Sequence, residues 1–568
     1  MLAAFSARSS RLRTLVLLHS KLELLYPPLV VEHASNVTNS FIGVDRWFGT
    51  SEVGKASVDK EKTLFEEYVK QHRISSLADT MKKEMYQEEL EDEQRHVPIR
   101  ARGFEYSFEC PGEFPMVYRT PCADGGYRET ERELVLDTSE LCAMVHPEQY
   151  IEMQAMKISR QGDRLLLLAQ VDGVPRVFIQ DMNNKGKAVL QEHIHDAMDI
   201  EYDIDGNIYF TCPDELGRPS KVYCTTAMKH QQGERPTPRL VFEDANRKHF
   251  VGIQRTKDWS YICINSVSKQ SSEVYIVDPD VGNAVLVRPR EPHCQYVVEH
   301  AHGHLIILSN HDHVLENQLY VAKLSHKGDY LCIESWKSVP YRLPREDGFL
   351  SDVTVHARAC TLIEKMPSGL PRIRVLPFQH SPGNDISLDA HYDIPLPEWV
   401  LDVQFGSNEE YMSDRVELEL QSPILPPIHL EWDLKTREVF SRSSLDHVEI
   451  KLQQYTAIRI PLQSTEGHTI PLTLAYRNDA VNPSKCLFVV YGAYGENLDM
   501  AYQSHIFPLL HRGWKVIYVH VRGGGEKGKA WYEAGRVPHK VNSESDLYEC
   551  ITQLTAKGTT SMTSITCT

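Results

Sequence analysis

The sequence predicts an all-β propeller followed by a parallel α/β domain and preceded by a helical segment. Its 568 residues exceed the roughly 250–300 at which single hydrophobic cores stop growing, so several domains are expected. Short β-branched and aromatic runs, separated by turn residues, occupy residues 98–445. From residue 446 onward, nearly continuous apolar runs alternate with helical patterns, which is typical of a parallel sheet.

Residues 1–50 form a basic leader in this interpretation. Arg8, Arg11, Arg13 and Lys21 precede the first acidic residue, Glu23, and this composition is typical of a mitochondrial presequence. A disordered basic tail is the alternative. The 12 cysteines contain no Cys-x-x-Cys pair, which favours a reducing compartment. The cytosol is therefore the predicted location, with import through residues 1–22 as the alternative.

Residues 51–97 form the predicted helical segment. Residues 58–95 lack glycine and proline, and apolar positions such as Leu77, Met81 and Met85 recur at helical spacing, which predicts two helices. The apolar stripe is expected to pack on the C-terminal domain. Acidic residues of the second helix, Glu84 and Glu88 among them, are expected to form a solvated face, with an acidic docking site as the alternative.

Residues 98–445 form the predicted propeller. Strand-like runs at 164–169, 208–212, 261–264 and 305–308 each follow a turn containing glycine or aspartate. Successive turns lie 43, 52 and 45 residues apart, and periods of about 40–50 residues are typical of propeller blades. The length of the region then corresponds to roughly seven blades.

Residues 446–568 form the predicted α/β domain. Residues 456–462 and 469–476 alternate like a hairpin, whereas 486–491 and 516–521 are apolar runs typical of buried strands. Helices are expected within 500–512, broken at Pro508 or starting after it, and at 545–557. A last extended run is expected at 562–568.

Composition excludes several classes of function. With 61 basic and 78 acidic side chains, the net charge of −17 argues against a nucleic-acid partner. No apolar run approaches the roughly 18 residues that a membrane span requires. No cofactor is expected.

Two glycine-rich turns follow the buried strands of the last domain. The first, VVYGAYG at 489–495, can present Tyr491 and Tyr494 at the carboxyl edge of the sheet, where α/β proteins bind ligands. The second, VHVRGGGEKGKAWYEAGR at 519–536, nearly matches a phosphate-binding loop. Ala530 stands where such a loop has the Ser or Thr that holds magnesium, so an NTPase site is the weaker alternative.

Together the two motifs resemble the catalytic domain of the prolyl oligopeptidase family of serine peptidases, especially its oligopeptidase B and prolyl endopeptidase-like branches. The family shares the Y-G-x-Y/F-G turn, the H-V-R-G-G-G-E-x-G strand and loop, and the following W-Y/H-x-x-G, in this order. The resemblance implies a seven-bladed propeller that caps an α/β-hydrolase domain. It also implies cleavage of short peptides.

The resemblance assigns roles to particular residues. Tyr491 matches the tyrosine whose hydroxyl forms half of the oxyanion hole, and Tyr494 matches an aromatic residue of the substrate pocket. Phenylalanine is common at the second position in the proline-specific branch, so strict proline specificity is not implied. A structural loop is implied for Arg522, Gly523, Gly524, Gly525 and Glu526, with Arg522 or a neighbour as the ion-pair partner of Glu526.

The catalytic triad has no match in the sequence. A hydrolase of this fold needs Ser, Asp and His in chain order, with the serine on a sharp turn between strand and helix. The sequence contains no Gly-x-Ser-x-Gly, and Asp499 and Asp546 precede the expected position of the nucleophile. We therefore expect the triad beyond residue 568. In this interpretation the sequence is an incomplete gene model or a truncated splice form of a longer peptidase, and residues 446–568 are the N-terminal part of its hydrolase domain.

The functional prediction is thus a serine peptidase acting on short peptides, and the alternative is a non-catalytic propeller that binds protein partners. No metal site is expected. Three His-x-His pairs can each place two imidazoles on one strand face, but scattered surface histidines are the favoured interpretation. The pairs are His193/His195, His302/His304 and His311/His313.

Overall fold

The computed structural model of this chain describes most of residues 74–567. The described range has gaps at 94–98, 110–114, 123–131, 146–150, 184–187, 228–235, 279–281, 313, 328–329, 340–347, 382–384, 442–445, 481–484 and 559–564. The predicted leader and the first predicted helix lie outside the described residues. The second predicted helix is α4 (Ile74–Glu93).

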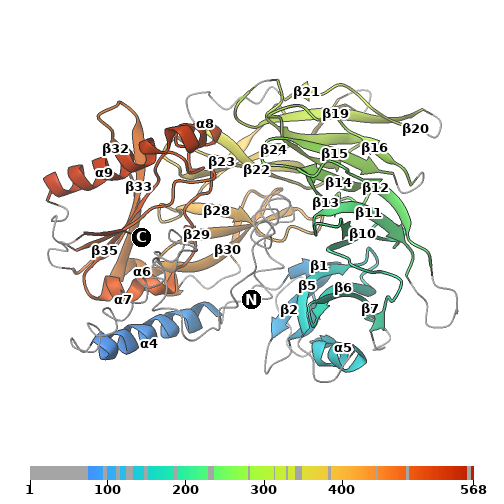
Figure 1. Ribbon diagram of the computed structural model, residues 1–568, viewed down its shortest axis with the longest axis horizontal. Coiled ribbons are helices and arrows are strands. Elements are labelled where there is room, and N and C mark those ends of the chain that lie inside the picture. Colours follow the sequence, from blue (N-terminus) through green and yellow to red (C-terminus); the bar gives the residue numbers. More distant parts are fainter. Residues whose placement is uncertain are drawn as a thin grey trace, which may run out of the picture.

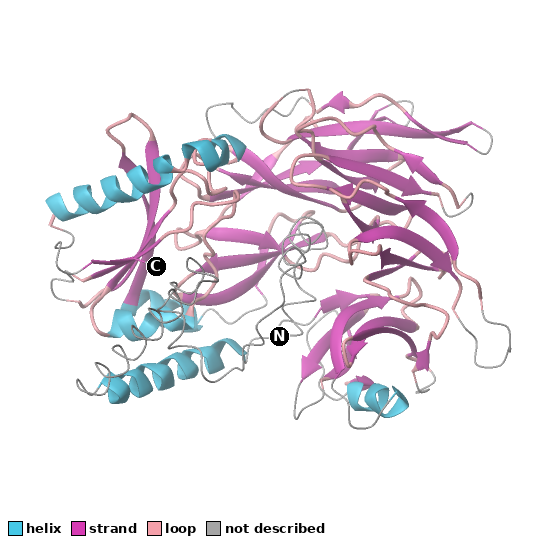
Figure 2. Ribbon diagram, viewed as in Figure 1, coloured by secondary structure: helices cyan, strands magenta, loops and turns pink. Residues whose placement is uncertain are grey.

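The described part of the propeller forms seven antiparallel sheets, which confirms the predicted architecture (Figures 1 and 2). In six of the seven blades the strands follow one another directly along the chain, and neighbouring strands in every blade are antiparallel. Helix α5 (Thr138–Val145) connects the first two blades.

The first blade comprises β1 (Ile99–Ala101), β2 (Phe104–Glu109), β3 (Met116–Pro121) and β4 (Glu133–Asp137), and the second comprises β5 (Ile151–Ile158), β6 (Arg164–Val171), β7 (Val174–Asp181) and β8 (Val189–Leu190). The third comprises β9 (Asp199–Tyr202), β10 (Ile208–Pro213), β11 (Pro219–Thr225) and β12 (Arg239–Glu243), and the fourth comprises β13 (Phe250–Arg255), β14 (Ile262–Val267), β15 (Ser272–Val277) and β16 (Ala284–Leu286).

The fifth blade comprises β17 (Tyr296–Ala301), β18 (His304–Ser309), β19 (Gln318–Lys327) and β20 (Tyr330–Ile333), with β21 (Lys337–Ser338) also paired to β19. The sixth comprises β22 (Phe349–Val355), β23 (Ala359–Lys365), β24 (Pro371–Pro377) and β27 (Tyr392–Ile394). The seventh comprises β28 (Asp402–Phe405), β29 (Arg415–Ser422), β30 (Leu425–Asp433) and β31 (Val439–Ser441). A small hairpin, β25 (Gln379–Ser381) and β26 (Asp385–Ser387), lies between β24 and β27 in the sequence.

The four strand-like runs that carried the repeat prediction are β6, β10, β14 and β18, the second strands of successive blades. Every residue of β14 and β18 is buried. A second strand packs against the neighbouring blade on each face, so its sequence reads as a continuous apolar run. This equivalence explains the spacing of the turns, since each precedes the same strand of its blade.

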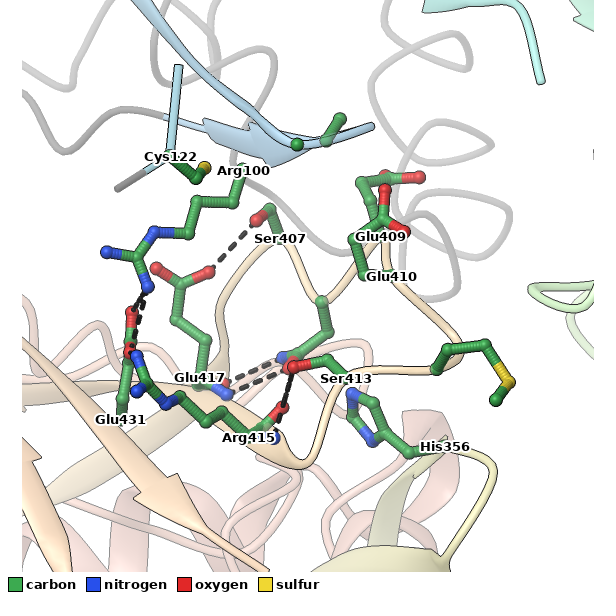
Figure 3. A pocket seen from close by; sticks show the side chains of 14 residues that line it. Arg100, Cys122, His356, Ser407, Glu409, Glu410, Ser413, Arg415, Glu417 and Glu431 are labelled. Carbon is green, nitrogen blue, oxygen red and sulfur yellow. Dashed lines mark hydrogen bonds and ion pairs between the residues drawn. The ribbon is translucent and has the colours of Figure 1, made fainter. Parts of the chain in front are cut away.

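Side chains close the ring between the first and seventh blades. The Arg100 guanidinium lies 2.8 Å from Glu431 Oε1, and the Arg102 backbone N–H donates to Glu410 Oε1 at 2.6 Å. A cavity of about 360 Å³ lies at this seam. Figure 3 shows the guanidinium groups of Arg100 and Arg415 converging on the Glu431 carboxylate at its wall. None of the residues proposed from the glycine motifs lines it.

The C-terminal sheet has the strand order β32-β33-β35-β34-β36. Its strands are β32 (Tyr455–Gln463), β33 (Thr469–Arg477), β34 (Cys486–Val489), β35 (Lys515–Val519) and β36 (Ile565–Cys567). Strands β32 and β33 form the predicted antiparallel hairpin, while β34 runs parallel to both β35 and β36. The fold class predicted for this domain is confirmed.

Helices of this domain are α6 (Asp446–Gln454), η2 (Ser504–Ile506), α7 (Phe507–His511), α8 (Lys529–Glu533), η3 (Val537–His539) and α9 (Val541–Ala556). The prediction that Pro508 breaks a helix or precedes one is wrong, because Pro508 lies in the first turn of α7. Proline is tolerated there since the first N–H groups of a helix have no intrahelical partner. Helix α9 begins four residues before its predicted start at 545.

Helix α4 lies beside α7 of the C-terminal domain (Figure 1). Glu84 accepts a hydrogen bond from Arg512 at 2.7 Å, and Glu88 pairs with Lys451 at 2.6 Å. The expectation of a purely solvated acidic face is therefore wrong at these two positions, where basic side chains of the C-terminal domain meet the carboxylates. Leu77, predicted to be in the packed stripe, is exposed. None of the described helices combines the length and apolar character that crossing a bilayer requires.

Candidate active site

The two glycine motifs meet at one edge of the C-terminal sheet. Tyr491 follows β34 and Arg522 follows β35, and these strands are parallel, so both motifs leave the sheet at its carboxyl edge. Gly495 N–H donates to Gly523 O at 3.0 Å, which joins one turn to the other. The structure therefore brings the predicted site residues of both motifs together.

Gly492 and Gly523 permit this close approach. Gly492 has φ +57°, and a Cβ there would lie 2.3 Å from Val521 Cγ2. At Gly523, with φ +98°, a Cβ would lie 2.3 Å from Gly492 O. Any larger residue at either position would push the two loops apart, and the positive φ at both positions also favours glycine. The Lys540 ammonium also donates to Gly492 O, which tethers the turn to the start of α9.

Tyr491 and Tyr494 both present their rings outside the core. Their exposed fractions are 49% and 62%. Tyr494 has φ +57°, a conformation that few residues other than glycine adopt, so the turn holds it at some energetic cost. The Lys269 ammonium of the propeller lies 4.3 Å from the centre of the Tyr494 ring, within range of a cation–π contact. The propeller thus meets the predicted substrate-pocket aromatic directly.

Arg522 is held by Asp546, which is only 1% exposed. Arg522 donates through its backbone N–H at 2.9 Å and through Nη2 at 2.7 Å to this carboxylate, and Nη2 also lies 2.9 Å from Glu466. Burial acts to lower the pKa of Arg522, but the hydrogen bonds to Asp546 and its charge raise it overall. Asp546 thus anchors the glycine loop as a structural partner.

His468 also contacts Asp546, with Nε2 at 2.9 Å from Oδ1. Its Nδ1 lies 3.7 Å from Glu466 Oε2. Both ring nitrogens of His468 therefore face carboxylates, whereas a catalytic histidine would face a serine hydroxyl. This His–Asp pair supports the loop and does not make a triad.

Glu526 pairs with His520, a neighbour in the second motif, and not with Arg522. Its Oε1 accepts the Leu498 N–H at 2.8 Å and lies 3.1 Å from His520 Nδ1. Burial acts to raise the pKa of Glu526, but the hydrogen bond and charge of His520 lower it overall. Arg522 pairs with the Asp546 carboxylate, while the buried Glu526 connects the second glycine loop to the segment that follows the first motif.

The second motif does not form a phosphate-binding loop. Its backbone donors are used within the loop: Gly523 N–H donates to Trp531 O at 3.0 Å, and Gly528 N–H donates to Gly525 O at 2.9 Å. Ala530 N–H donates to the Glu316 carboxylate at 3.1 Å. A phosphate would need these N–H groups and would be repelled by that carboxylate. The NTPase alternative is therefore wrong.

The contacts that Lys269 and Glu316 of the propeller make with the glycine motifs were not predicted from the sequence, because both are isolated polar residues in turns. Glu316 lies between β18 and β19 and reaches the start of α8. No local pattern marks either residue, since their partners are more than 200 positions away in the chain.

The histidine pairs are not uniformly at the surface, contrary to the favoured interpretation. His193 and His304 are buried. His193 Nε2 lies 3.2 Å from Thr226 O, and His304 Nδ1 lies 2.8 Å from His302 O. Backbone carbonyls thus contact these rings. His313 lies outside the described residues.

Comparison with known proteins agrees with this architecture. Residues 50–442 match the model of the prolyl oligopeptidase N-terminal beta-propeller domain, and residues 501–568 match that of the prolyl oligopeptidase family. A prolyl endopeptidase-like protein of Xenopus laevis is 30% identical over 331 residues, covering 56% of this chain and 43% of that relative. Protease 2 of Moraxella lacunata is 24% identical over 532 residues, covering 89% and 72%. The chain thus spans less than half of the Xenopus relative.

Solved structures share the fold. Oligopeptidase B from Trypanosoma brucei, in a closed form with covalently bound antipain, has a TM-score of 0.72 and 21% identity, over 91% of this chain and 72% of that one. Oligopeptidase B from Leishmania major has a TM-score of 0.70 and 19% identity, over 91% and 72%. With family models matching both the propeller and the C-terminal domain, the chain belongs to the prolyl oligopeptidase family.

Proposed function

We propose that this chain provides the propeller and the oxyanion-binding part of a serine peptidase that hydrolyses short peptides. The observation that carries the proposal is the half-exposed Tyr491 at the carboxyl edge of the sheet, beside a second glycine loop that faces the propeller. Relatives named as peptidases support the reaction class.

Tyr491 has the chemistry that the proposed role requires. A phenolic O–H can donate a hydrogen bond to the oxygen that becomes negative when a peptide carbonyl is attacked. Gly492 and the Lys540 contact fix the turn that carries it, so the donor is positioned before the reaction begins. The second donor would be the backbone N–H that follows the nucleophilic serine.

The triad follows the general mechanism of this class. The serine oxygen attacks the carbonyl carbon, the histidine takes its proton and later delivers that proton to the leaving amine, and the aspartate orients the imidazole. The proposal assigns none of these three roles to a residue within 1–568. His468 and Asp546, the His–Asp pair in the candidate site, already hold Arg522.

Contacts between the propeller and the hydrolase domain support short peptides as the substrates. Lys269 contacts the Tyr494 ring, and Glu316 accepts a hydrogen bond from Ala530 at the start of α8, so the two domains touch beside the proposed substrate-pocket residue. A propeller that stays in contact with the hydrolase domain here would restrict the access of a folded protein more than that of a short extended peptide. We therefore propose short peptides as the substrates.

A fluorophosphonate probe tests the reaction class, because it reacts with an activated serine and not with a scaffold. We expect the native protein purified from its source to be labelled, and a short peptide substrate to slow that labelling. The recombinant chain 1–568, which contains no Gly-x-Ser-x-Gly, serves as the unlabelled control. An unlabelled native protein, alongside a labelled reference peptidase, would favour the non-catalytic propeller that binds protein partners.

A further inference from the structure

A cluster of nitrogen, oxygen and sulfur ligands lies on the propeller, outside the candidate active site. Glu291 and Cys294 belong to the connection between β16 and β17, and His311 follows β18. One ligand atom from each of the three side chains lies within 4.8 Å of the other two. The three come from two segments that meet only in the folded propeller.

The His311 ring is held in one orientation. Tyr320 and Trp336 pack against it, with ring centres at 5.9 and 5.3 Å. Its Nε2 lies 2.9 Å from Asp312 Oδ1. Because a carboxylate oxygen only accepts, this contact favours the proton on Nε2 and leaves the lone pair on Nδ1. A carboxylate that fixes the tautomer in this way is the usual outer partner of a metal-binding histidine.

His311 Nδ1 faces the Glu291 carboxylate. This atom is buried, has no hydrogen-bond partner among the described residues, and lies 3.5 Å from Glu291 Oε2. With the proton on Nε2, two lone pairs face each other across this gap, an arrangement that a cation between them would stabilise. Arg288 donates to the other carboxylate oxygen, Oε1, at 3.0 Å and so turns Oε2 toward the ring.

Cys294 is the third candidate ligand and the most buried of the three. It is 6% exposed, and its sulfur has a weak contact, 3.8 Å from Ser309 Oγ. The Glu291 side chain is 40% exposed, so an ion can enter from its side and the carboxylate can move. Sulfur, imidazole nitrogen and carboxylate oxygen together suit zinc, whose bonds of about 2.0–2.3 Å require the three groups to close by roughly 1 Å.

We propose that Cys294 Sγ, His311 Nδ1 and the Glu291 carboxylate bind a zinc ion, with water as the fourth ligand. Binding forms a zinc–thiolate bond, and the thiol proton is released to solvent, so no oxidant or reductant is needed. Neither the peptidase reaction nor the family match assigns this site. Zinc binding here would depart from the expectation, made from the sequence, that the chain has no metal site.

The position of the ion would have a structural consequence. It would connect the 288–294 turn to the segment after β18, which continues to Glu316 and its contact with Ala530. Zinc would therefore stiffen the part of the propeller that meets the hydrolase domain.

Cobalt(II) titration of the untagged, metal-stripped chain 1–568 tests the proposal, because a cysteine ligand produces a thiolate-to-cobalt charge-transfer band in the near ultraviolet. We expect one equivalent to bind, the band to appear, and zinc to displace cobalt. Cys294→Ser should abolish the band. Asp312→Asn should retain it but weaken zinc binding by about 10–100-fold, as loss of an outer partner does.

Cys332→Ser is the matched control, since Cys332 lies on β20 of the same blade and should leave the titration unchanged. His311→Gln gives a second ligand variant should Cys294→Ser fold poorly, and thermal melting without metal checks each variant. The proposal is overturned if cobalt gives no charge-transfer band at one equivalent. It is also overturned if Cys294→Ser and His311→Gln, both folded, bind zinc as tightly as the unaltered chain.

Discussion

Glu316 of the propeller accepts the backbone N–H of Ala530 in the hydrolase domain at 3.1 Å, so one carboxylate joins the two domains beside the candidate active site. Burial acts to raise the pKa of Glu316, and it outweighs the backbone hydrogen bonds from Ala530 and Lys529, which lower it. Because the pKa is raised overall, the stability that this contact contributes should depend on pH.

Glu316→Gln should remove a pH dependence of stability. A carboxyl group whose pKa is raised on folding binds more protons in the folded state, so its contribution to stability increases as pH falls from neutral toward the ordinary glutamate pKa of about 4.3. Glutamine keeps an acceptor for Ala530 without titrating. The free energy of unfolding of the unaltered chain, measured from about pH 7.5 to 4.5, should thus rise relative to that of the variant.

Glu533→Gln is the control for this comparison, because Glu533 is an exposed residue of α8 whose carboxylate pairs with Arg536 three residues along the chain. The change in the free energy of unfolding between neutral and acidic pH should be the same for Glu533→Gln as for the unaltered chain, within error. Parallel curves for Glu316→Gln and the unaltered chain would contradict the assignment of a raised pKa to Glu316.

Asp546→Asn should destabilise the chain by about 3 kcal/mol, because it leaves the Arg522 guanidinium without its buried counter-charge. Asp546 accepts hydrogen bonds from both the backbone and the side chain of Arg522. Glu466→Gln removes the more exposed carboxylate from the same guanidinium and should cost less than about 1 kcal/mol. Urea unfolding of both variants measures the difference. Equal losses would show that Asp546 is not the main anchor.

Gly492→Ala should be more damaging than Gly467→Ala, although both glycines have positive φ. Gly467 lies in the turn between β32 and β33, where an added Cβ would meet no atom within 4 Å, so its substitution costs only the conformational strain of about 1–2 kcal/mol. Alanine at 492 must also displace Val521, which adds about 1–3 kcal/mol. Thermal or urea unfolding compares them, and similar losses would contradict the close contact.

Strands were predictable where burial on both faces gives a local apolar run. The second strands β14 and β18 of the blades and the parallel strand β35 are of this kind, and the spacing of the turns before the second strands predicted the repeat. The position of α7 was missed because a proline can either end a helix or lie in its first turn, and local sequence does not distinguish these outcomes.

Partners between distant segments were not predictable in the same way. The expected partner of Glu526 was Arg522 or a neighbour, and only the fold shows that His520 contacts Glu526 while Asp546 holds Arg522. Glu291, Cys294 and His311 likewise have no recognisable metal-ligand spacing. Charge pairing depends on which segments fold against one another, and only the positions of the glycine loops themselves could be read from the local pattern.

Tyr491→Phe, made in the complete native protein, should lower kcat by about 10²–10³ if Tyr491 donates to the oxyanion. Phenylalanine keeps the ring of this half-exposed residue but removes the O–H, so substrate binding should change much less than turnover. Steady-state hydrolysis of a short peptide measures both parameters. Tyr548→Phe is the control, since Tyr548 is an exposed tyrosine of α9 and should retain full activity. A Tyr491→Phe enzyme with near-normal kcat would reject the oxyanion role. A loss of kcat without a comparable change in KM would show that the hydroxyl stabilises the negative charge of the transition state and not the bound substrate.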